Sequence, residues 1–302
     1  MHITMPQKYL SRYLLLLSCS SLLFFWAACD ENPPFPLNLT PDTAQDTTYM
    51  ATIEAAQTKN VLVEDFTGVQ CVNCPKGHET LKNLEEANAG RVIGVSIHAG
   101  DLSDPLPNSD SSFVLPQGAA LYNLLGVEGL PAAAINRVHF PDQDYIAVVG
   151  SGAWTAKVNE ELLQTQASVN LHLDKQYDPV TRQLSIVTQL NYSQTIDSNI
   201  EHRISVYIVE GGIIDPQETT EDGKTFIIED YEHNSVLRQM VTFVDGSVAD
   251  APDKAAGRVV VKTFNLTLPA NIDANHCHII AFVQEKTAES QAILQVQQTN
   301  VQ

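Results

Sequence analysis

The stretch NVLVEDFTGVQCVNCPKG, residues 60–77, joins an apolar segment directly to a pair of cysteines separated by two residues. Residues 60–68 are typical of a buried strand that ends in a turn. The segment from Pro75 to Gly90 has the apolar spacing of a helix, and proline is tolerated in a first helical turn. The stretch therefore predicts a strand, a CxxC loop and a helix in that order.

The position of the cysteines at the start of a helix suggests redox chemistry. The positive end of the helix dipole favours thiolate over thiol. In this interpretation Cys71 is the exposed nucleophile, and Cys74, within the first turn, resolves a mixed disulfide. The pair could instead form a structural disulfide, or bind a metal together with His78. A metal site needs a fourth ligand, which no second CxxC or nearby histidine pair supplies. We expect no metal and no cofactor.

The composition indicates a folded, acidic protein. Hydrophobic residues make up 44% of the 302 residues and charged residues 18%, which is typical of globular chains. This length accommodates about two domains of ordinary size. The formal net charge of -19 repels nucleic acid, so we expect no nucleic-acid partner.

The first 29 residues have the layout of a bacterial export signal. Lys8 and Arg12 precede an apolar run over residues 13–26, which is too short for a membrane-spanning helix. WAAC, residues 26–29, resembles a lipobox, which predicts lipid attachment at Cys29. Trp26 departs from that pattern, in which an aliphatic residue is usual. Ordinary secretory cleavage after Ala27 or Ala28 is the alternative.

Residues 30–50 are polar and rich in proline, as expected for a flexible tether between a lipid and a folded body. These features predict a protein that is exported and anchored by a lipid in the cell envelope. Thiols oxidise in that compartment, so a CxxC can function there as a disulfide.

The remainder of the chain divides into two patterns. Up to residue 167, apolar strand-like segments alternate with helical ones, which predicts one α/β domain over residues 51–167. Its further strands are expected at residues 91–100 and 128–137, and its further helices at 117–127 and 152–167. From residue 168 to 302, about seven short segments alternate polar and apolar residues, which predicts a β-sandwich. The loop over residues 101–116 is rich in Asp, Ser and Pro, and it either shapes a groove or decorates the surface.

Residues 63–75, VEDFTGVQCVNCP, resemble the strand, turn and active site of the thioredoxin family. Asp65 lies six residues before Cys71, the spacing of the buried acid that relays protons to the second cysteine in that family. Glu64 takes this place if the facing of the strand is shifted by one residue. The departures are Val72-Asn73 inside the motif and Gln70 in place of the usual tryptophan, so no redox potential is carried over.

Residues 127–137, VEGLPAAAINR, resemble the thioredoxin segment that carries a cis-proline. The resemblance implies that Pro131 faces the CxxC and that the backbone of Leu130 pairs with a bound substrate chain. Two landmarks in the correct order are more specific than a CxxC alone.

Most of the mature chain resembles the outer membrane protein 28 family of Gram-negative lipoproteins, which implies a lipid anchor in the outer membrane, on its periplasmic side or at the surface. The resemblance rests on EDFTGVQCVNCP, GVSIHAG, GVEGLPAAAINR and YEHNSVLRQ, in that order. It implies an α/β thioredoxin-like domain followed by an all-β, immunoglobulin-like sandwich. The catalytic residues would be Cys71, Cys74 and Asp65, with a disulfide between the two cysteines.

Two functions from different classes are compatible with this resemblance. The first is thiol–disulfide exchange on exported proteins that carry disulfides or thiols. The alternative is a non-enzymatic lipoprotein that binds an unknown surface partner and keeps the CxxC as a structural disulfide.

Three further residues are candidates for a role. His98 could face the CxxC loop or be structural. Cys277 is expected to be a core thiol, and Arg238 is expected to form an ion pair or a domain contact.

Overall fold

The computed structural model describes residues 46–249, 251 and 253–302. The predicted signal peptide, with Cys29, and most of the predicted tether lie outside the described residues. Among the helices in the described part, none has the length and apolarity needed to cross a membrane.

The end of the predicted tether is a strand. Thr47–Met50 forms β1, which pairs antiparallel with the strand β15, Arg258–Thr267. The hydroxyl of Thr48 also donates to the carbonyl oxygen of Val259 over 2.8 Å. All four residues of β1 are exposed, which is why their hydrophobic pattern did not predict a strand.

The first half of the described chain contains the predicted strands and helices. Its elements are β2 (Val61–Thr67), α2 (Cys74–Ala87), β3 (Val92–His98), α3 (Pro116–Leu124), β4 (Ala132–Ile135), β5 (Ala147–Val149), η1 (Ser151–Ala153) and α4 (Trp154–Leu162). Both α2 and α3 have proline at the start of the helix, where its missing N–H would be unpaired in any case. β2 and β3 are buried along their whole length.

The second half is almost entirely β structure. Its long strands are β6 (Val169–Tyr177), β7 (Gln183–Tyr192), β8 (Glu201–Glu210), β15, β16 (Cys277–Lys286) and β17 (Ile293–Asn300). The shorter elements are β9 (Ile213–Ile214), β10 (Gln217–Glu221), β11 (Lys224–Ile228), β12 (Glu232–His233), β13 (Val236–Met240), β14 (Ser247–Val248) and η2 (Ala274–His276). Of the shorter strands, only β11 corresponds to a predicted segment.

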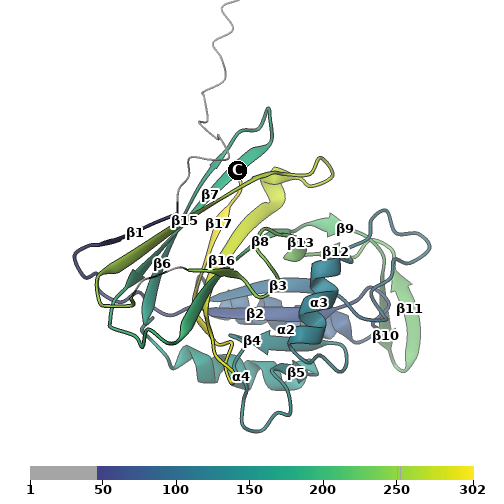
Figure 1. Ribbon diagram of the computed structural model, residues 1–302. Coiled ribbons are helices and arrows are strands. Elements are labelled where there is room, and N and C mark those ends of the chain that lie inside the picture. The colour runs from purple at the N-terminus through teal and green to yellow at the C-terminus, as the bar shows by residue number, and fades with distance from the viewer. Residues whose placement is uncertain (1–45, 250, 252) are drawn as a thin grey trace, which may run out of the picture. The chain divides into compact units, whose positions relative to one another are not determined.

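The two halves share one sheet. In the part of the chain that the structure describes, a nine-stranded sheet has the order β17-β16-β8-β13-β3-β2-β4-β5, and β14 also pairs with β8 (Figure 1). The junction is a short parallel pairing of β13 with β3, in which Val236 lies opposite Ser96. The N–H of Ser96 donates to the carbonyl oxygen of Ser235 over 2.8 Å. The strands of the α/β half therefore continue into those of the β half without an edge between them.

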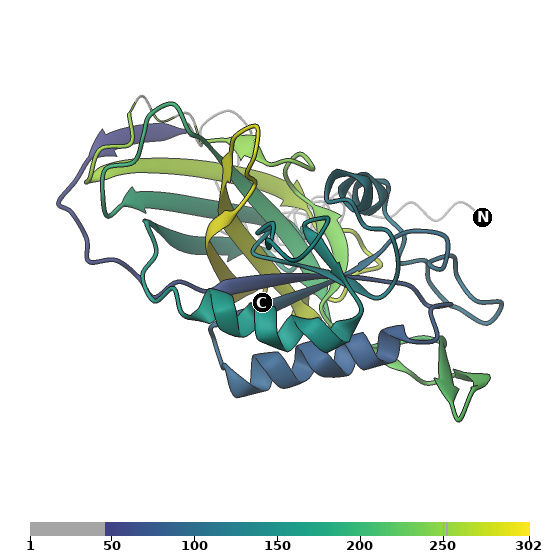
Figure 2. The same cartoon turned by 90° about the horizontal axis from the view of Figure 1, so that it is seen from below.

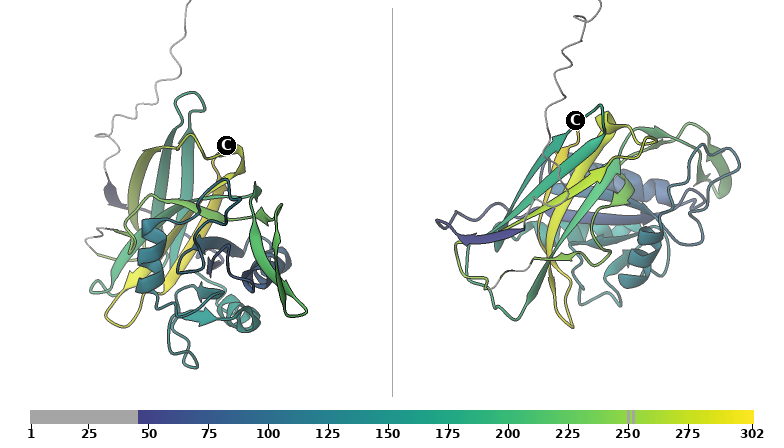
Figure 3. Two further views of the ribbon diagram at one scale, coloured as in Figure 1. Left: turned by 90° about the vertical axis from the view of Figure 1, so that its right-hand side faces the viewer. Right: turned by 45° about the horizontal axis from the view of Figure 1, so that its top comes forward.

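Each face of β2 contributes to a different core. Val61 and Val63 belong to a cluster with residues of α2 and α4, the helices that run side by side along one face of the sheet (Figure 2). Leu62 and Phe66 point to the other face, into a cluster that includes α3, β8 and β16. A third cluster lies between the shared sheet and the four-stranded sheet β1-β15-β7-β6 (Figure 3). β8 and β16 are consequently buried on both faces.

A buried ion pair links the two halves. Arg137 donates to both carboxylate oxygens of Glu64 over 2.7 Å, and both side chains are fully buried. The same guanidinium donates to Gln284 on β16 over 2.6 Å and to the hydroxyl of Tyr207 on β8 over 2.9 Å. Asn136 and Arg137, the two residues that follow β4, have φ values of 45° and 51°.

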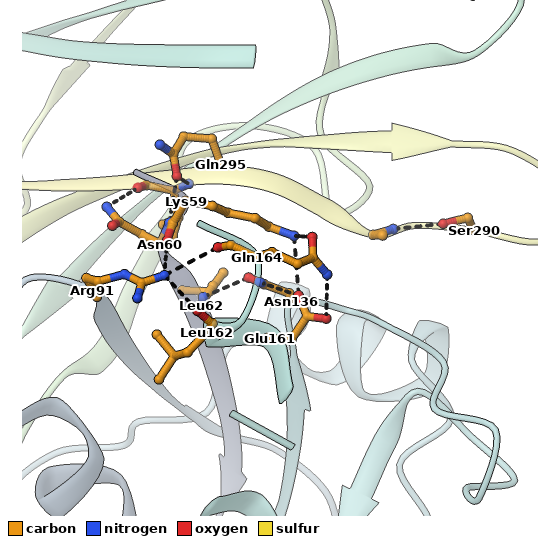
Figure 4. A network of polar contacts seen from close by, with 12 residues as sticks. Lys59, Asn60, Leu62, Arg91, Asn136, Glu161, Leu162, Gln164, Ser290 and Gln295 are labelled. Carbon is orange, nitrogen blue, oxygen red and sulfur yellow. Dashed lines mark hydrogen bonds and ion pairs between the residues drawn. The ribbon is translucent and has the colours of Figure 1, made fainter. Parts of the chain in front are cut away.

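A second polar network ties the start of β2 to β17 and α4 (Figure 4). The N–H of Asn60 donates to the side-chain oxygen of Gln295 over 3.0 Å, and its side-chain amide donates to the carbonyl oxygen of Val296 over 3.0 Å. Asn136 accepts from the N–H of Leu62 and donates to Glu161 on α4 over 2.8 Å. The two networks hold β2, which leads into the CxxC loop, at its start and at its middle.

Candidate redox site

The CxxC loop leaves β2 and enters α2 within a few residues. Cys71 and Cys74 are joined by a disulfide. The N–H of Cys71 donates to the carbonyl oxygen of Gly68, and the N–H of Cys74 donates to that of Cys71, both over 3.0 Å. Cys74 is the first residue of α2, with Pro75 after it.

The expectation that Cys71 is exposed is wrong, since only 2% of its surface is accessible. The cover is the hairpin of β10 and β11, which lies near the amino-terminal end of α2 (Figure 2). The side-chain amide of Gln217 donates to the carbonyl oxygens of Gly68 and Cys71 over 3.2 and 3.3 Å. The N–H of Glu218 donates to the carbonyl oxygen of Val69 over 2.8 Å. Exposed Asn73 shows that the rim of the loop still reaches solvent.

The loop over residues 101–116 forms another wall of the site. The carbonyl oxygen of Leu102 accepts from the N–H of Gln70 over 2.9 Å. A Cβ added at Gly68 would lie 2.3 Å from that same oxygen, so only glycine fits there. Phe113 is buried in a small cluster with Val69. The loop thus packs against the CxxC loop, which a surface decoration would not do.

Asp65 lies on the face of β2 that α2 covers. Its side chain is fully buried, and neither carboxyl oxygen has a hydrogen-bond partner among the described residues. Burial raises the pKa of Asp65 well above its usual value. Glu64, the alternative candidate, faces the opposite side of the sheet in its ion pair with Arg137. The acid that accompanies the CxxC on the α2 side is therefore Asp65.

His78 connects Asp65 to the second half of the chain. Its Nε2 lies 3.7 Å from the carboxyl oxygen Oδ2 of Asp65 and 2.8 Å from the hydroxyl of Thr67. Its Nδ1 lies 2.8 Å from the hydroxyl of Tyr231. Burial and the neighbouring His233 lower the pKa of His78 to about 3, so the ring is neutral at physiological pH. His78 was considered above only as a metal ligand.

Pro131 packs against the same helix. The Leu130–Pro131 peptide bond is cis, as the resemblance implied. A Cβ added at Gly77 of α2 would lie 3.1 Å from the Cβ of Pro131, so the proline contacts the helix close to Cys74. The carbonyl oxygen of Pro131 accepts from the N–H of Gly150 over 2.8 Å.

A cavity of about 660 Å³ opens between α2 and residues 231–236. Its inner wall carries Pro75, His78, Ser96, His98, Tyr231 and His233. His98 is 2% exposed, and its ring centroid lies 5.7 Å from that of His233 and 4.8 Å from that of Phe113. Neither ring nitrogen of His98 has a partner among the described residues, and burial lowers its pKa. The described residues contain no group of three or more His, Cys, Asp or Glu side chains suited to hold a metal ion.

Sequence reasoning missed the residues of the site that come from the second half of the chain. Tyr231 and His233 lie in the quoted segment YEHNSVLRQ, but the pattern gives no sign that they reach α2. Arg238 of the same segment pairs with Glu210 over 3.1 Å, as expected for an ion pair. Cys277 is a buried free thiol in the core, also as expected.

Comparison with known proteins identifies related chains. The sequence model of a family described as outer membrane protein Omp28 matches residues 118–302. No curated protein sequence matches the chain. Among solved structures, HBP35 of Porphyromonas gingivalis is similar with a TM-score of 0.62 and 19% identity, covering 82% of this chain and 76% of that one. At that identity the likeness shows the fold alone.

Two further structures are more distant. A structural-genomics target from Agrobacterium tumefaciens has a TM-score of 0.47 and 14% identity, covering 82% of this chain and 97% of that one. A domain of the outer membrane lipoprotein Omp28 from Porphyromonas gingivalis has a TM-score of 0.29 and 16% identity, covering 44% and 88%. Neither score is high enough to bear on the fold.

Proposed function

The chain belongs to the Omp28 family of outer membrane proteins, and we propose that it performs thiol–disulfide exchange on exported proteins in the cell envelope. The proposal rests on one observation, the buried carboxyl group of Asp65, which lacks a hydrogen-bond partner among the described residues and lies beside the helix that begins at Cys74. An unsatisfied buried polar group costs about 1–3 kcal/mol of stability. Groups that are kept at such a cost cluster at functional sites.

The exchange uses the two cysteines in sequence. A substrate thiolate attacks the Sγ of Cys71, breaks its bond to Cys74 and forms a mixed disulfide. Cys74 leaves as a thiolate and takes a proton through Asp65. A second substrate thiolate then attacks the substrate sulfur of the mixed disulfide and releases Cys71 as a thiolate. The substrate loses two electrons and gains a disulfide, and the cysteine pair is reduced by the same two electrons. Run backwards, the steps reduce a substrate disulfide.

The finer architecture belongs to the same proposal. Residues 51–167 act as a thioredoxin-like domain, and residues 168–302 as an immunoglobulin-like sandwich. The backbone of Leu130, before Pro131, pairs with the substrate chain at the CxxC. A lipid at Cys29 anchors the protein in the outer membrane. The similarity to the fold of HBP35 supports the two-part architecture.

The burial of Cys71 means that substrate must first displace the β10–β11 hairpin. The same burial is the observation that favours the second candidate function, an interaction protein whose disulfide is structural. In that case the hairpin itself offers a surface, because Phe226 and Ile227 on β11 are 44% and 40% exposed. As successive residues of a strand, the two side chains point to opposite faces of the hairpin, so each face carries one exposed apolar side chain that a partner could contact.

Insulin reduction and a measured redox potential test the enzymatic proposal. We expect the parent protein and a Cys277→Ala control to reduce insulin, and Cys71→Ser to lose that activity. Equal activity of the parent and Cys71→Ser would rule the proposal out. The second candidate predicts instead that a Cys71→Ser/Cys74→Ser variant keeps its partner binding, and that Phe226→Ser loses it.

A further inference from the structure

A line of polar side chains runs from buried Asp65 toward the cavity beside α2. His78 stands 3.7 Å from Asp65 through its Nε2, and the hydroxyl of Tyr231 stands 2.8 Å from the Nδ1 of the same ring. Exposure rises along the line, since the side chain of Asp65 is fully buried, that of His78 is 16% exposed, and Tyr231 lies partly at the surface. His78 and Tyr231 both line the cavity.

Asp65 needs such a connection because its surroundings are otherwise dry. Its neighbour across β4 is Ala133, and the helix face above it belongs to an apolar cluster with Val63 and Leu81. A carboxyl group in that position exchanges protons slowly unless a second proton carrier reaches it. His78 is an ionisable side chain that approaches it, and the hydroxyl of Thr67 holds the Nε2 edge of the ring toward β2.

The chemistry of the two outer residues suits proton transfer. A neutral imidazole has one nitrogen that accepts and one that donates, so it takes up a proton on one side while it releases another on the opposite side. The low pKa of His78, about 3, means that both transfers occur together without a lasting imidazolium. Burial raises the pKa of Tyr231 to about 12, so its hydroxyl keeps a proton to donate.

We propose that His78 and Tyr231 carry protons between Asp65 and the water of the cavity, so that the second half of the chain completes the redox site. When Cys74 accepts a proton from Asp65, one proton moves from His78 to Asp65, another from Tyr231 to His78, and a third from water to Tyr231. Asp65, His78 and Tyr231 each end with as many protons as they began with, Cys74 gains one proton, the water that supplied it is left as hydroxide, and no electrons move. His78 and Tyr231 act through Asp65 and do not touch the substrate. This inference rests on the proposed exchange activity.

The environment of His78 defines how a pH profile is interpreted. The other titratable groups that face it from β2, β3, α2 and residues 231–233 are Asp65, His98, Glu79, Tyr231, Glu232 and His233. Burial lowers the pKa values of His98 and His233, so these rings are harder to protonate than a free histidine over the range tested. Variants that change only His78 or Tyr231 keep the remaining groups, so a difference between profiles reports on the relay.

The experiment follows reduction of the Cys71–Cys74 disulfide by dithiothreitol, using thiol trapping of the full folded chain. Rates are measured from pH 6 to 9 in H₂O and D₂O for the parent, His78→Phe and Tyr231→Phe. His139→Phe and Tyr145→Phe, on the exposed loop before β5, are the matched controls. We expect both relay variants to react at least about tenfold more slowly and to lose the solvent isotope effect of the parent. Their equilibrium constants with dithiothreitol should stay at the parental value, because a relay changes rates only.

The outcomes separate the relay from the exchange activity. If the parent and both relay variants share rate, pH profile and isotope effect, the relay is wrong and the exchange activity stands. If dithiothreitol does not reduce the parental disulfide, the proposed exchange activity is wrong, and the relay proposal is wrong with it. A shift of the equilibrium constant in both variants would mean that the two side chains are structural. Tyr231→Phe removes one oxygen atom at a partly exposed position, so the test remains possible if His78→Phe does not fold.

Discussion

The side-chain amide of Gln217 donates a hydrogen bond to the backbone carbonyl oxygen of Cys71, a residue 146 positions earlier in the chain. A second bond from the same amide reaches Gly68. Through these bonds, a hairpin of the carboxyl-terminal half closes over a disulfide of the amino-terminal half. Access to the cysteines is therefore set by how easily this hairpin opens.

Gln217→Ala should make the disulfide more reactive. The substitution removes hydrogen bonds worth about 0.5–1.5 kcal/mol each, which lowers the free energy needed to open the hairpin. A decrease of about 1.4 kcal/mol raises the population of the open state about tenfold. We expect reduction by dithiothreitol to accelerate about tenfold. Gln176→Ala, at an exposed position on β6, should react like the parent. An unchanged rate in Gln217→Ala would show that the hairpin does not limit access.

Asp65→Ala should stabilise the oxidised protein at neutral and alkaline pH. The pKa of Asp65 in the folded state lies well above its usual value of 3.8. At pH values below 3.8 the carboxyl is protonated in both the folded and the unfolded state, so it does not weaken the fold. The free energy of unfolding then falls as the pH rises through the folded-state pKa. Removing the carboxyl should therefore raise the free energy of unfolding by about 1–3 kcal/mol at pH 8.

The increase in the free energy of unfolding caused by Asp65→Ala should become smaller as the pH falls toward 4. Urea unfolding at pH 4, 6 and 8 measures it, and Asp144→Ala, at an exposed position, serves as the control. A difference between parent and variant that does not change with pH would contradict the raised pKa of Asp65.

Arg137→Met should destabilise both halves of the chain together. The substitution leaves the carboxylate of Glu64 buried without its partner, which costs about 3–5 kcal/mol. Because Arg137 also bonds to β8 and β16, calorimetry should show one unfolding transition at a lower temperature. Arg258→Met, which removes a pair with Asp253 in a loop near β15, should have a much smaller effect. Two separated transitions would mean that the halves unfold independently.

Gly68→Ala should disturb the CxxC loop. The added Cβ would stand 2.3 Å from the carbonyl oxygen of Leu102, so either the CxxC loop or the 101–116 loop must shift. Forcing atoms into a packed site costs about 1–3 kcal/mol. Gly152→Ala is the matched control, because a Cβ there meets nothing within 4 Å. Thermal unfolding of both variants, with thiol trapping of Cys71, measures the effect.

The local parts of the site were predictable from the sequence. The CxxC, Asp65 and Pro131 lie on segments whose own patterns specify strand, turn and helix, and these elements form as expected. The choice between Asp65 and Glu64 was harder, because all seven residues of β2 are buried and its apolar pattern does not reveal which face α2 covers. Only the partner Arg137, 73 residues away, shows that Glu64 points to the other side.

The remote parts of the site were not predictable. Gln217 and Tyr231 reach the site across 146 and 153 residues, and no local periodicity encodes such a contact. β13 is five residues long with an irregular register against β8, so it gave no strand signal of its own, yet it joins the two halves. The prediction that Cys71 is exposed was wrong for the same reason, because the hairpin that covers it is distant in sequence.

The distance between Cys71 and its cover also sets an order of events during synthesis. A chain emerges amino-terminal end first at about 5–20 residues per second, so Gln217 follows Cys71 by roughly 7–30 seconds. The strand β13, which β3 requires as a neighbour, is delayed similarly. For that interval the nascent cysteine pair is open to any thiol or oxidant nearby, and it becomes a protected site only when the last third of the protein has arrived.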